Sequence, residues 1–244
     1  MPGIGIDVAG LKKKLGPNQA LDGTDFSFAG GVLHGLIGPD GAGKTTLLRT
    51  LMGLLKPDAG SIRFFNEASS SVAFKDVRGG MAYMPQRQSL YADLSVGEHL
   101  DFFRDMYSLP DDVYRARRAE LLSITRLDKF TDRAAGQLSG GMYKKLGLMC
   151  SLLQSPNVLL LDEPTNGVDP ISRREFWELL YRLAGGNVTI IVSTAYMDEA
   201  ERCAQIHLLD RGRALAEGEP RAVLAKEGVA SFDEFFLKRE GAAK

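Results

Sequence analysis

The sequence predicts an α/β protein in which a largely parallel sheet is covered by helices and interrupted by one helical insertion. Short β-type apolar runs alternate with helix-like stretches, a pattern typical of parallel sheets with crossover helices. These runs occupy residues 26–28, 32–37, 158–161, 189–193 and 206–210. A glycine-rich loop joins residues 32–37 to a helix-like run at 46–55, and no convincing strand occurs between about 89 and 153.

Composition and charge are those of an ordinary globular protein. The 244 residues are 44% apolar and 25% charged, with a formal net charge of −1, which argues against a nucleic-acid-binding protein. The longest apolar runs, 158–161 and 188–192, fall far short of the roughly 20 residues that span a bilayer. The first ten residues lack the pattern of a secretory signal. Cys150 and Cys203 are too few for a disulfide scaffold, so we expect buried, reduced thiols in a cytosolic protein.

The strand-poor segment is expected to form an inserted helical subdomain. Apolar residues recur at helical spacing in residues 96–107, 111–124 and 141–153. Glycine- or proline-containing pairs at 79–80, 84–85 and 155–156 are candidate hinges at its borders. After Gly212 we expect a small peripheral extension, with a mobile charged tail from Lys238.

A candidate phosphate-binding loop lies between the run at 32–37 and the helix-like run that follows. Residues 38–45 fit the pattern G-x-x-x-x-G-K-[ST]. The expected nucleotide contacts are Gly38, Pro39, Asp40, Gly41, Ala42, Gly43, Lys44, Thr45 and Thr46. Glycines let backbone N–H groups turn toward phosphates, the helix N-terminus adds partial positive charge, and Lys44 reaches the outer phosphates. Thr45 offers a hydroxyl to Mg²⁺. The alternative is a chance glycine-rich turn.

Two adjacent acids, Asp162 and Glu163, end the apolar run at 158–161. Burying unpaired carboxylates is costly, so both need partners at the carboxyl edge of the sheet. Beside a phosphate loop that edge faces the nucleotide. We therefore expect Asp162 to hold Mg²⁺ through water and Glu163 to polarise the attacking water. The alternative is an acidic turn before Pro164.

The run 138–142, Leu-Ser-Gly-Gly-Met, resembles the LSGGQ signature of ABC ATPases, which other P-loop families lack. Gln86 follows an apolar strand as in the Q-loop, residues 162–165 resemble Walker B, and residues 166–169 resemble the D-loop. The resemblance covers nearly the whole chain. It implies a P-loop NTPase with a RecA-like, mainly parallel sheet core, an antiparallel β subdomain and an inserted helical subdomain.

The resemblance also divides the single domain, residues 1–244, into parts. The implied ATP-binding core comprises residues 1–88 and 156–218, the helical signature subdomain residues 89–155, and a C-terminal extension residues 219–244.

The activity implied is hydrolysis of ATP with Mg²⁺. Carried over to this chain, Glu163 and Gln86 are catalytic, while Thr45, Gln86 and Asp162 surround the metal. The signature places Ser139, Gly140 and Gly141 at a helix start, a second anion site with nothing on its own chain to bind. As the resemblance implies, a second ABC domain packs head to tail, and each ATP lies between one phosphate loop and the other chain's signature.

The run 193–201, with Asp169-Pro170 upstream, is most similar to exporters that partner ABC-2-type permeases, including drug-efflux ATPases. This implies a cytoplasmic subunit on the inner face of the cell membrane, bound to an integral membrane permease. In such relatives the segment 86–107 forms a groove for a coupling helix of the permease. The apolar and aromatic residues there are Tyr91, Leu94, Phe102, Phe103 and Tyr107. For each of them, ordinary core packing is the preferred expectation.

Four positions near the nucleotide depart from the family pattern. Ala195 stands where a switch histidine normally touches the γ-phosphate, and Leu15 where an aromatic residue stacks on adenine. Asp40 replaces an asparagine, and Met142 replaces the signature glutamine. These departures predict an asymmetric pair in which this chain's own site binds ATP but hydrolyses it slowly. Such sites occur in N-terminal halves of tandem exporters, and this chain could be one such half.

The three histidines are not expected to replace the missing one. His34 and His207 lie in strand-like runs and His99 in the helical insertion, so we expect structural roles.

Two other functions stay open. The first is an ATP-dependent dimerising clamp or regulatory module with little turnover, favoured by Ala195 and Leu15. The second is an ABC ATPase acting on ribosomes or DNA, which would normally show paired domains with a long basic linker or a coiled-coil insertion; this sequence shows neither.

Overall fold

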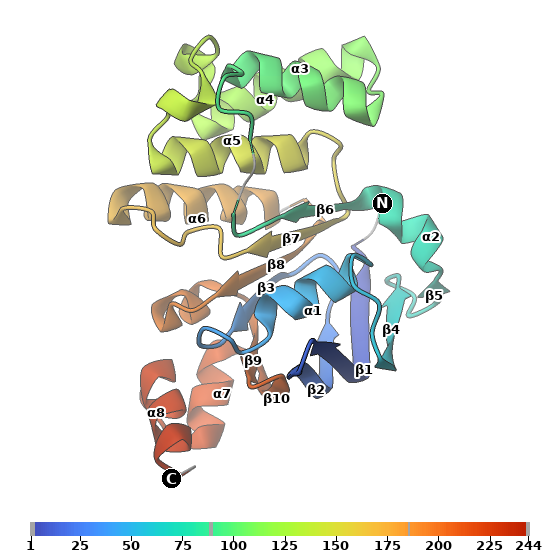
Figure 1. Ribbon diagram of the computed structural model, residues 1–244, viewed down its shortest axis with the longest axis vertical. Helices are drawn as coiled ribbons and strands as arrows, with labels where there is room; N and C mark the ends of the chain where they lie inside the picture. Colours follow the sequence, from blue (N-terminus) through green and yellow to red (C-terminus); the bar gives the residue numbers. More distant parts are fainter. Residues whose placement is uncertain (1–2, 88–89, 185, 243–244) are drawn as a thin grey trace.

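Two sheets form the framework of the molecule (Figure 1). The computed structural model describes residues 3–87, 90–184 and 186–242. The larger sheet has the order β10-β9-β3-β8-β7-β6, in which all neighbours are parallel except the antiparallel pair of β9 and β10. Its strands are β3 (Leu33–Ile37), β6 (Met81–Met84), β7 (Val158–Asp162), β8 (Thr189–Thr194), β9 (Gln205–Asp210) and β10 (Arg213–Gly218). The predicted α/β class with a mainly parallel core is confirmed.

The smaller sheet is antiparallel and has the order β2-β1-β4-β5. Its strands are β1 (Gly5–Leu15), β2 (Asn18–Phe28), β4 (Ala59–Phe65) and β5 (Ser71–Val72). It lies beside α1 (Lys44–Leu51) in Figure 1. This sheet is the antiparallel part that the family resemblance implied.

The helical insertion forms as predicted. Its helices are α3 (Val96–Tyr107), α4 (Asp111–Thr125) and α5 (Gly140–Leu152), and they gather on the side of the larger sheet that also carries α6 (Pro170–Ala184) (Figure 1). Helix α3 begins with a capping box, because Ser95 accepts the backbone N–H of Glu98 while the Glu98 carboxylate accepts that of Ser95. Short 3₁₀ turns and α2 (Phe74–Val77) complete the connections.

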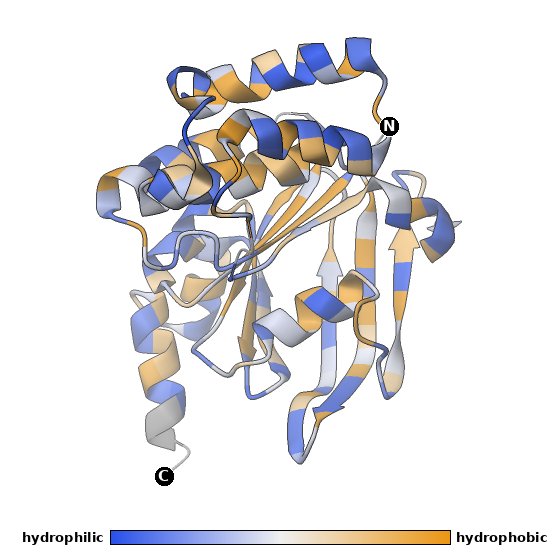
Figure 2. Cartoon of the chain, turned by 45° about the horizontal axis from the view of Figure 1, so that its top comes forward, coloured by the Kyte–Doolittle hydropathy of each residue, from blue (hydrophilic) through white to orange (hydrophobic). Residues whose placement is uncertain are grey.

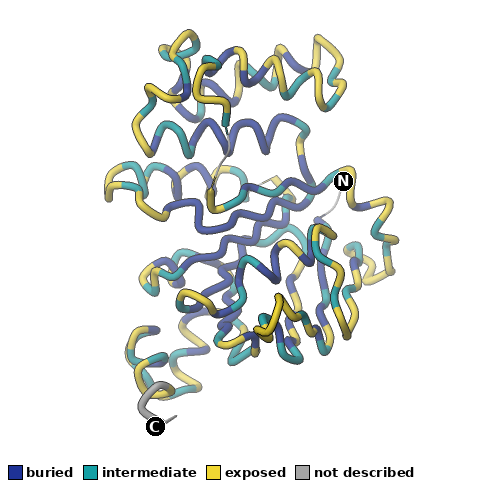
Figure 3. Tube along the Cα trace, viewed as in Figure 1, coloured by how far each residue is buried: buried dark blue, intermediate teal, exposed yellow. Residues whose placement is uncertain are grey.

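Apolar side chains divide between the two faces of the larger sheet. In β7, Leu159 and Leu161 join the core beneath α5 and α6, whereas Val158 and Leu160 join the core beneath α1. Such a strand is buried on both faces and reads as a continuous apolar run. The central strands of the larger sheet are mostly orange (hydrophobic) in Figure 2 and mostly dark blue (buried) in Figure 3.

Three sequence expectations need correction. The helix predicted over 46–55 ends at Leu51, and Gly53 in the turn that follows has a φ of 73°. Residues 213–218, expected at the periphery, form β10 and pair with β9. The expected charged tail from Lys238 belongs, as far as residue 242, to α8 (Phe232–Ala242), and residues 243–244 lie outside the described residues. Helix α8 buries Phe232 and Phe235 against the main core together with Val223 of α7 (Pro220–Glu227).

The cysteines and histidines are internal. Cys150 and Cys203 are buried free thiols, and burial raises the pKa of each to about 12. His34 and His207 face each other with ring nitrogens 3.0 Å apart. His99 contacts backbone groups within its own segment. The structural roles expected for the histidines fit these positions.

Among the described residues, no helix is long and apolar enough to cross a membrane.

Candidate functional site

The glycine-rich loop is fixed by close packing against the smaller sheet. Gly43 precedes α1 with a φ of 109°, and a Cβ atom there would lie 2.5 Å from the carbonyl oxygen of Ala20. Only glycine fits such a position. Lys44 is buried, and its Nζ donates hydrogen bonds to the carbonyl oxygens of Gly38 (2.8 Å) and Pro39 (3.0 Å). The loop therefore holds the Lys44 side chain at the N-terminus of α1.

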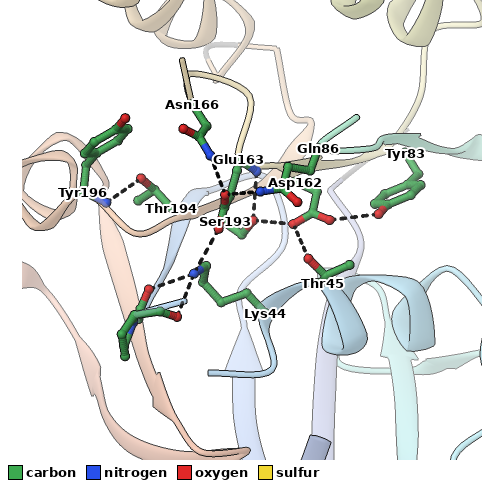
Figure 4. A network of polar contacts seen from close by, with 12 residues as sticks. Lys44, Thr45, Tyr83, Gln86, Asp162, Glu163, Asn166, Ser193, Thr194 and Tyr196 are labelled. Carbon is green, nitrogen blue, oxygen red and sulfur yellow. Dashed lines mark hydrogen bonds and ion pairs between the residues drawn. The ribbon is translucent and has the colours of Figure 1, made fainter. Parts of the chain in front are cut away.

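Lys44 also contacts Glu163, the acid that directly follows strand β7. Its Nζ lies 3.1 Å from Oε1 of Glu163, and both side chains are more than nine-tenths buried. Oε2 of Glu163 accepts hydrogen bonds from Nε2 of Gln86 (2.6 Å) and from Nδ2 of Asn166 (3.1 Å). Glu163 has a φ of 46°, a conformation that non-glycine residues rarely adopt and that is concentrated at functional sites. Figure 4 shows these side chains converging from separate segments.

Asp162 is completely buried and satisfied by hydroxyl groups. Oδ1 accepts hydrogen bonds from Oγ1 of Thr45 (3.1 Å) and Oγ of Ser193 (2.8 Å), and Oδ2 accepts one from the hydroxyl of Tyr83 (3.0 Å). The two carboxylates thus have different surroundings: Glu163 meets a cation and amides, and Asp162 meets hydroxyls. The alternative of an acidic turn before Pro164 does not account for these partners.

A cavity of about 490 Å³ opens over the loop. It is lined by Leu15, Asn18, Ala20, Asp40, Gly41, Ala42, Gly43, Lys44, Thr45, Thr46, Gln86, Glu163 and Asn166. Gly38 and Pro39, also predicted as nucleotide contacts, instead accept hydrogen bonds from Lys44 through their carbonyl groups. Asp40 is exposed.

The oxygen donors around the loop suit Mg²⁺. Thr45 and Asp162 place a hydroxyl and a carboxylate in direct contact, and Mg²⁺ prefers such ligands, supplemented by water and substrate phosphates. Among the described residues no cluster of three or more His, Cys, Asp or Glu side chains could hold a metal alone. The residues therefore fit a metal that arrives with a phosphorylated ligand.

Ala195 borders a second cavity of about 130 Å³. This cavity shares three lining residues, Asp40, Glu163 and Asn166, with the first cavity. The remaining walls are Thr194 and Tyr196. No imidazole lines it, since the chain's three histidines are buried elsewhere.

The signature residues lie outside the main cavity. Ser139 caps α5 and accepts the backbone N–H of Met142 (3.3 Å), and both Ser139 and Gly140 are exposed. Gly141 is buried close to α6, and a Cβ atom there would lie 2.5 Å from the side chain of Ser172 in α6. The structure therefore brings Lys44, Asp162, Glu163 and Gln86 together but leaves Ser139 and Gly140 facing solvent.

The aromatic residues of α3 and the segment before it only partly follow the preferred expectation of core packing. Tyr91 and Phe102 are 57% and 40% exposed, so core packing is wrong for these two. Phe103, Tyr107 and the partly buried Leu94 are closer to it, and the first two line a cavity of about 250 Å³. The segment also includes residues 88–89, which lie outside the described residues.

Sequence reasoning gave no role to Tyr83, Ser193 or Asn166, which complete the polar network. Asn166 begins the segment that resembles a D-loop, and Ser193 ends a predicted strand. Their positions beside the site could therefore have been predicted from the sequence. Tyr83 carries no such signal, because its contact depends on which face of β6 it occupies.

Comparison with known proteins agrees with this geometry. The family described as "ABC transporter" matches residues 21–166. The chain is 46% identical over 231 residues to the probable multidrug ABC transporter ATP-binding protein YbhF of Escherichia coli, covering 93% of this chain and 39% of that protein. It is 39% identical to the Nod factor export ATP-binding protein I of Ralstonia nicotianae, covering 93% and 72%. A solved ATP-binding subunit of an ABC transporter superposes with a TM-score of 0.81 at 28% identity, covering 96% and 98%.

Proposed function

This chain belongs to the ABC transporter family of ATP-binding domains, and from that premise we propose that it binds Mg-ATP and hydrolyses it to drive efflux through a membrane permease. The observation that carries the proposal is the buried contact of Lys44 with Glu163, 3.1 Å, on the wall of one cavity. A phosphate-binding cation and a carboxylate fit to polarise water thus lie side by side.

Residues 38–46 bind the phosphates in this proposal. Backbone N–H groups at the start of α1 and the ammonium group of Lys44 stabilise the negative charge. Residues 40–46 do so directly. Gly38 and Pro39 act through their carbonyl groups, which orient Lys44.

Thr45, Asp162 and Gln86 hold Mg²⁺ in the proposal. When bound, the metal neutralises charge that develops on the phosphates. Asp162 keeps the hydroxyl of Thr45 oriented. Gln86, hydrogen-bonded to Glu163, connects the metal side of the site with the residue that orients water.

Glu163 is the proposed general base, with Gln86 as its catalytic partner. Asn166 and Gln86 fix one carboxylate oxygen, and Lys44 fixes the other. For catalysis Lys44 must exchange Glu163 for the phosphate oxygens, which frees Oε1 for the attacking water.

A second ABC domain completes the site in this proposal. Ser139 and Gly140 are exposed at the start of α5, a suitable anion site, and lie outside this chain's own cavity. Gly141 contributes by letting α5 approach α6. These residues would meet the ATP held by the partner's loop.

We further propose that the chain's own site turns over slowly. The cavity beside Ala195 has no imidazole near Glu163, and the loss of a positioned donor or proton carrier typically lowers the rate of the chemical step about 10²-fold. Leu15, 44% exposed, offers adenine an aliphatic contact instead of a ring. A different partner chain, or a linked second half, would then carry the faster site.

The proposed transport function includes a membrane-spanning partner. YbhF and the Nod factor protein are both named as transport components, and the chain spans 39% of the length of YbhF. We propose an ABC-2-type permease as the partner, the cytoplasmic face of the membrane as the location, and a separate or covalently linked second ABC domain as the counterpart. The domain division into residues 1–88 with 156–218, 89–155 and 219–244 is part of the same proposal.

The alternative is an ATP-dependent clamp with little turnover, which Ala195 and Leu15 favour. The two functions differ in whether ATP is consumed once a dimer has formed.

The test is Mg-ATP hydrolysis by the chain and by Glu163→Gln. We expect the variant to bind ATP within about twofold of the original affinity while turnover falls at least 100-fold, because only the water-orienting carboxylate is neutralised. A measurable original rate that Glu163→Gln leaves unchanged would remove Glu163 from the mechanism. Turnover no higher than the uncatalysed background in both proteins, with ATP still bound, would favour the clamp.

A further inference from the structure

Asp162 receives three hydroxyl hydrogen bonds, each from a different element (Figure 4). Thr45 belongs to α1, Ser193 to β8 and Tyr83 to β6. Thr45 and Ser193 share Oδ1, whereas Tyr83 is the donor to Oδ2. The orientation of this buried carboxylate therefore depends on Tyr83, because a plane anchored at one oxygen can still rotate.

The register of β6 determines where the Tyr83 side chain points. Ala82 and Met84 belong to the core beneath the helical insertion, while Tyr83 packs against the core on the α1 side. Tyr83 pairs with Leu160 in β7, two residues before Asp162. Its ring thus lies under α1 with the hydroxyl directed at the end of β7.

Arg49 of α1 sets the direction of the Tyr83 proton. Its Nε donates to the Tyr83 oxygen at 3.4 Å, and a guanidinium can only donate. The single proton of the tyrosine hydroxyl is then left for Asp162.

We propose that Tyr83 is a positioning residue for the metal, fixing the plane of the Asp162 carboxylate for Mg²⁺ through its hydroxyl. The inference rests on the proposed function, in which Asp162 holds the metal. Partners that orient metal ligands typically change metal affinity by about 10- to 100-fold when removed. Since Thr45 and Ser193 remain, we expect the lower end of that range.

The experiment measures Mn²⁺ binding to the full chain by electron paramagnetic resonance in the presence of ATP, with Mn²⁺ as the probe for Mg²⁺. Metal-free ATP binding in EDTA is measured in parallel. Tyr83→Phe removes the hydroxyl and keeps the ring. Tyr114→Phe is the matched control, because Tyr114 donates to Asp101 in the helical insertion, a second tyrosine-carboxylate bond outside the site.

For Tyr83→Phe we expect the Kd of Mn²⁺ to rise about 10-fold, with metal-free ATP binding within about twofold of the original. At saturating Mg²⁺ we expect kcat within about threefold. Tyr114→Phe should leave both affinities unchanged. Arg49→Met, an exposed change that frees the hydroxyl to rotate, should raise the Mn²⁺ Kd by about threefold.

Two results would overturn the inference. One is a Mn²⁺ Kd in Tyr83→Phe equal to that of Tyr114→Phe. The other is a parallel loss of metal-free ATP binding, which would make Tyr83 a packing residue. Asp162→Asn separates this failure from that of the proposed function: if it too leaves the Mn²⁺ Kd unchanged, Asp162 is not a metal ligand and the proposed site is wrong.

Discussion

At the junction of the two sheets, the surroundings of His34 determine its protonation state. Its ring is buried against Phe28, contacts the carbonyl of Ala29 through Nε2 (2.9 Å) and meets His207 through Nδ1 (3.0 Å). His207 in turn contacts Glu217 of β10 (3.1 Å). Burial, aided by His207, lowers the pKa of His34 to about 4. The histidine is therefore neutral in the folded protein at physiological pH.

This lowered pKa makes stability depend on pH. Between about pH 6.5 and 4 the unfolded chain binds a proton at His34 that the folded chain does not. The contribution of His34 to the free energy of unfolding is thus fully present above pH 6.5 and is lost as the pH decreases toward 4. Urea unfolding at pH 7, 6 and 5 should show this loss.

His34→Gln should reduce the number of protons taken up on unfolding between about pH 6.5 and 4 by about one, and with it the pH dependence of the free energy of unfolding. The reason is that the amide does not titrate, although it can still donate to Ala29. His207, whose pKa is also lowered by burial, keeps its own contribution. Identical slopes in the two proteins would contradict a buried neutral His34.

The residues of the site differ in how far the sequence predicts them. Lys44, Thr45, Asp162 and Glu163 stand in motifs whose chemistry is tied to spacing, and the structure brings them together as expected. Tyr83 has no motif of its own. Its contact with Asp162 follows from strand register, which depends on pairing across the sheet.

At the scale of elements, Glu199 joins three segments around the site. It lies in the 3₁₀ turn after β8 and is completely buried. Its Oε1 accepts hydrogen bonds from Thr165 (2.9 Å), Arg173 (2.7 Å) and Trp177 (2.9 Å). The segment after β7, helix α6 and the segment that contains Ala195 are therefore tied to one carboxylate.

Replacing Glu199 should loosen all three segments. We expect Glu199→Gln to lower the free energy of unfolding by about 3 kcal/mol, because Arg173 loses a buried partner and the amide cannot serve all three donors. Chemical denaturation measures the effect. Asp198→Asn is the matched control, since Asp198 contacts the same arginine but is 64% exposed. Equal effects of the two changes would mean that the buried network contributes no special stability.

Elements differ in predictability for a physical reason. Helices α3 to α5 follow from local apolar spacing, so their ranges were close to correct. Strand β10 has the sequence Arg-Ala-Leu-Ala-Glu-Gly, which is richer in helix formers than in β-branched residues. It is a strand because β9 offers it a pairing edge, and local sequence does not record that edge.

On the scale of the whole molecule, the cavity over the phosphate loop and the exposed signature residues are two separate features. The cavity over the phosphate loop is lined by Lys44, Thr45, Gln86 and Glu163, while Ser139 and Gly140 face solvent outside it. In the proposed function the chain is one member of a pair, able to bind ATP and to complete a partner's site. Its own site is expected to be slow because Ala195 leaves a cavity beside Glu163.

The most direct test is Mg-ATP turnover by Ala195→His and by the original chain over a range of protein concentrations. We expect the histidine to fill the cavity beside Glu163 and raise kcat at least about tenfold. The rate per chain should rise steeply with concentration in both proteins, as a dimeric site requires. Rapid turnover by the original chain, with no gain in Ala195→His, would contradict the claim that this site is slowed.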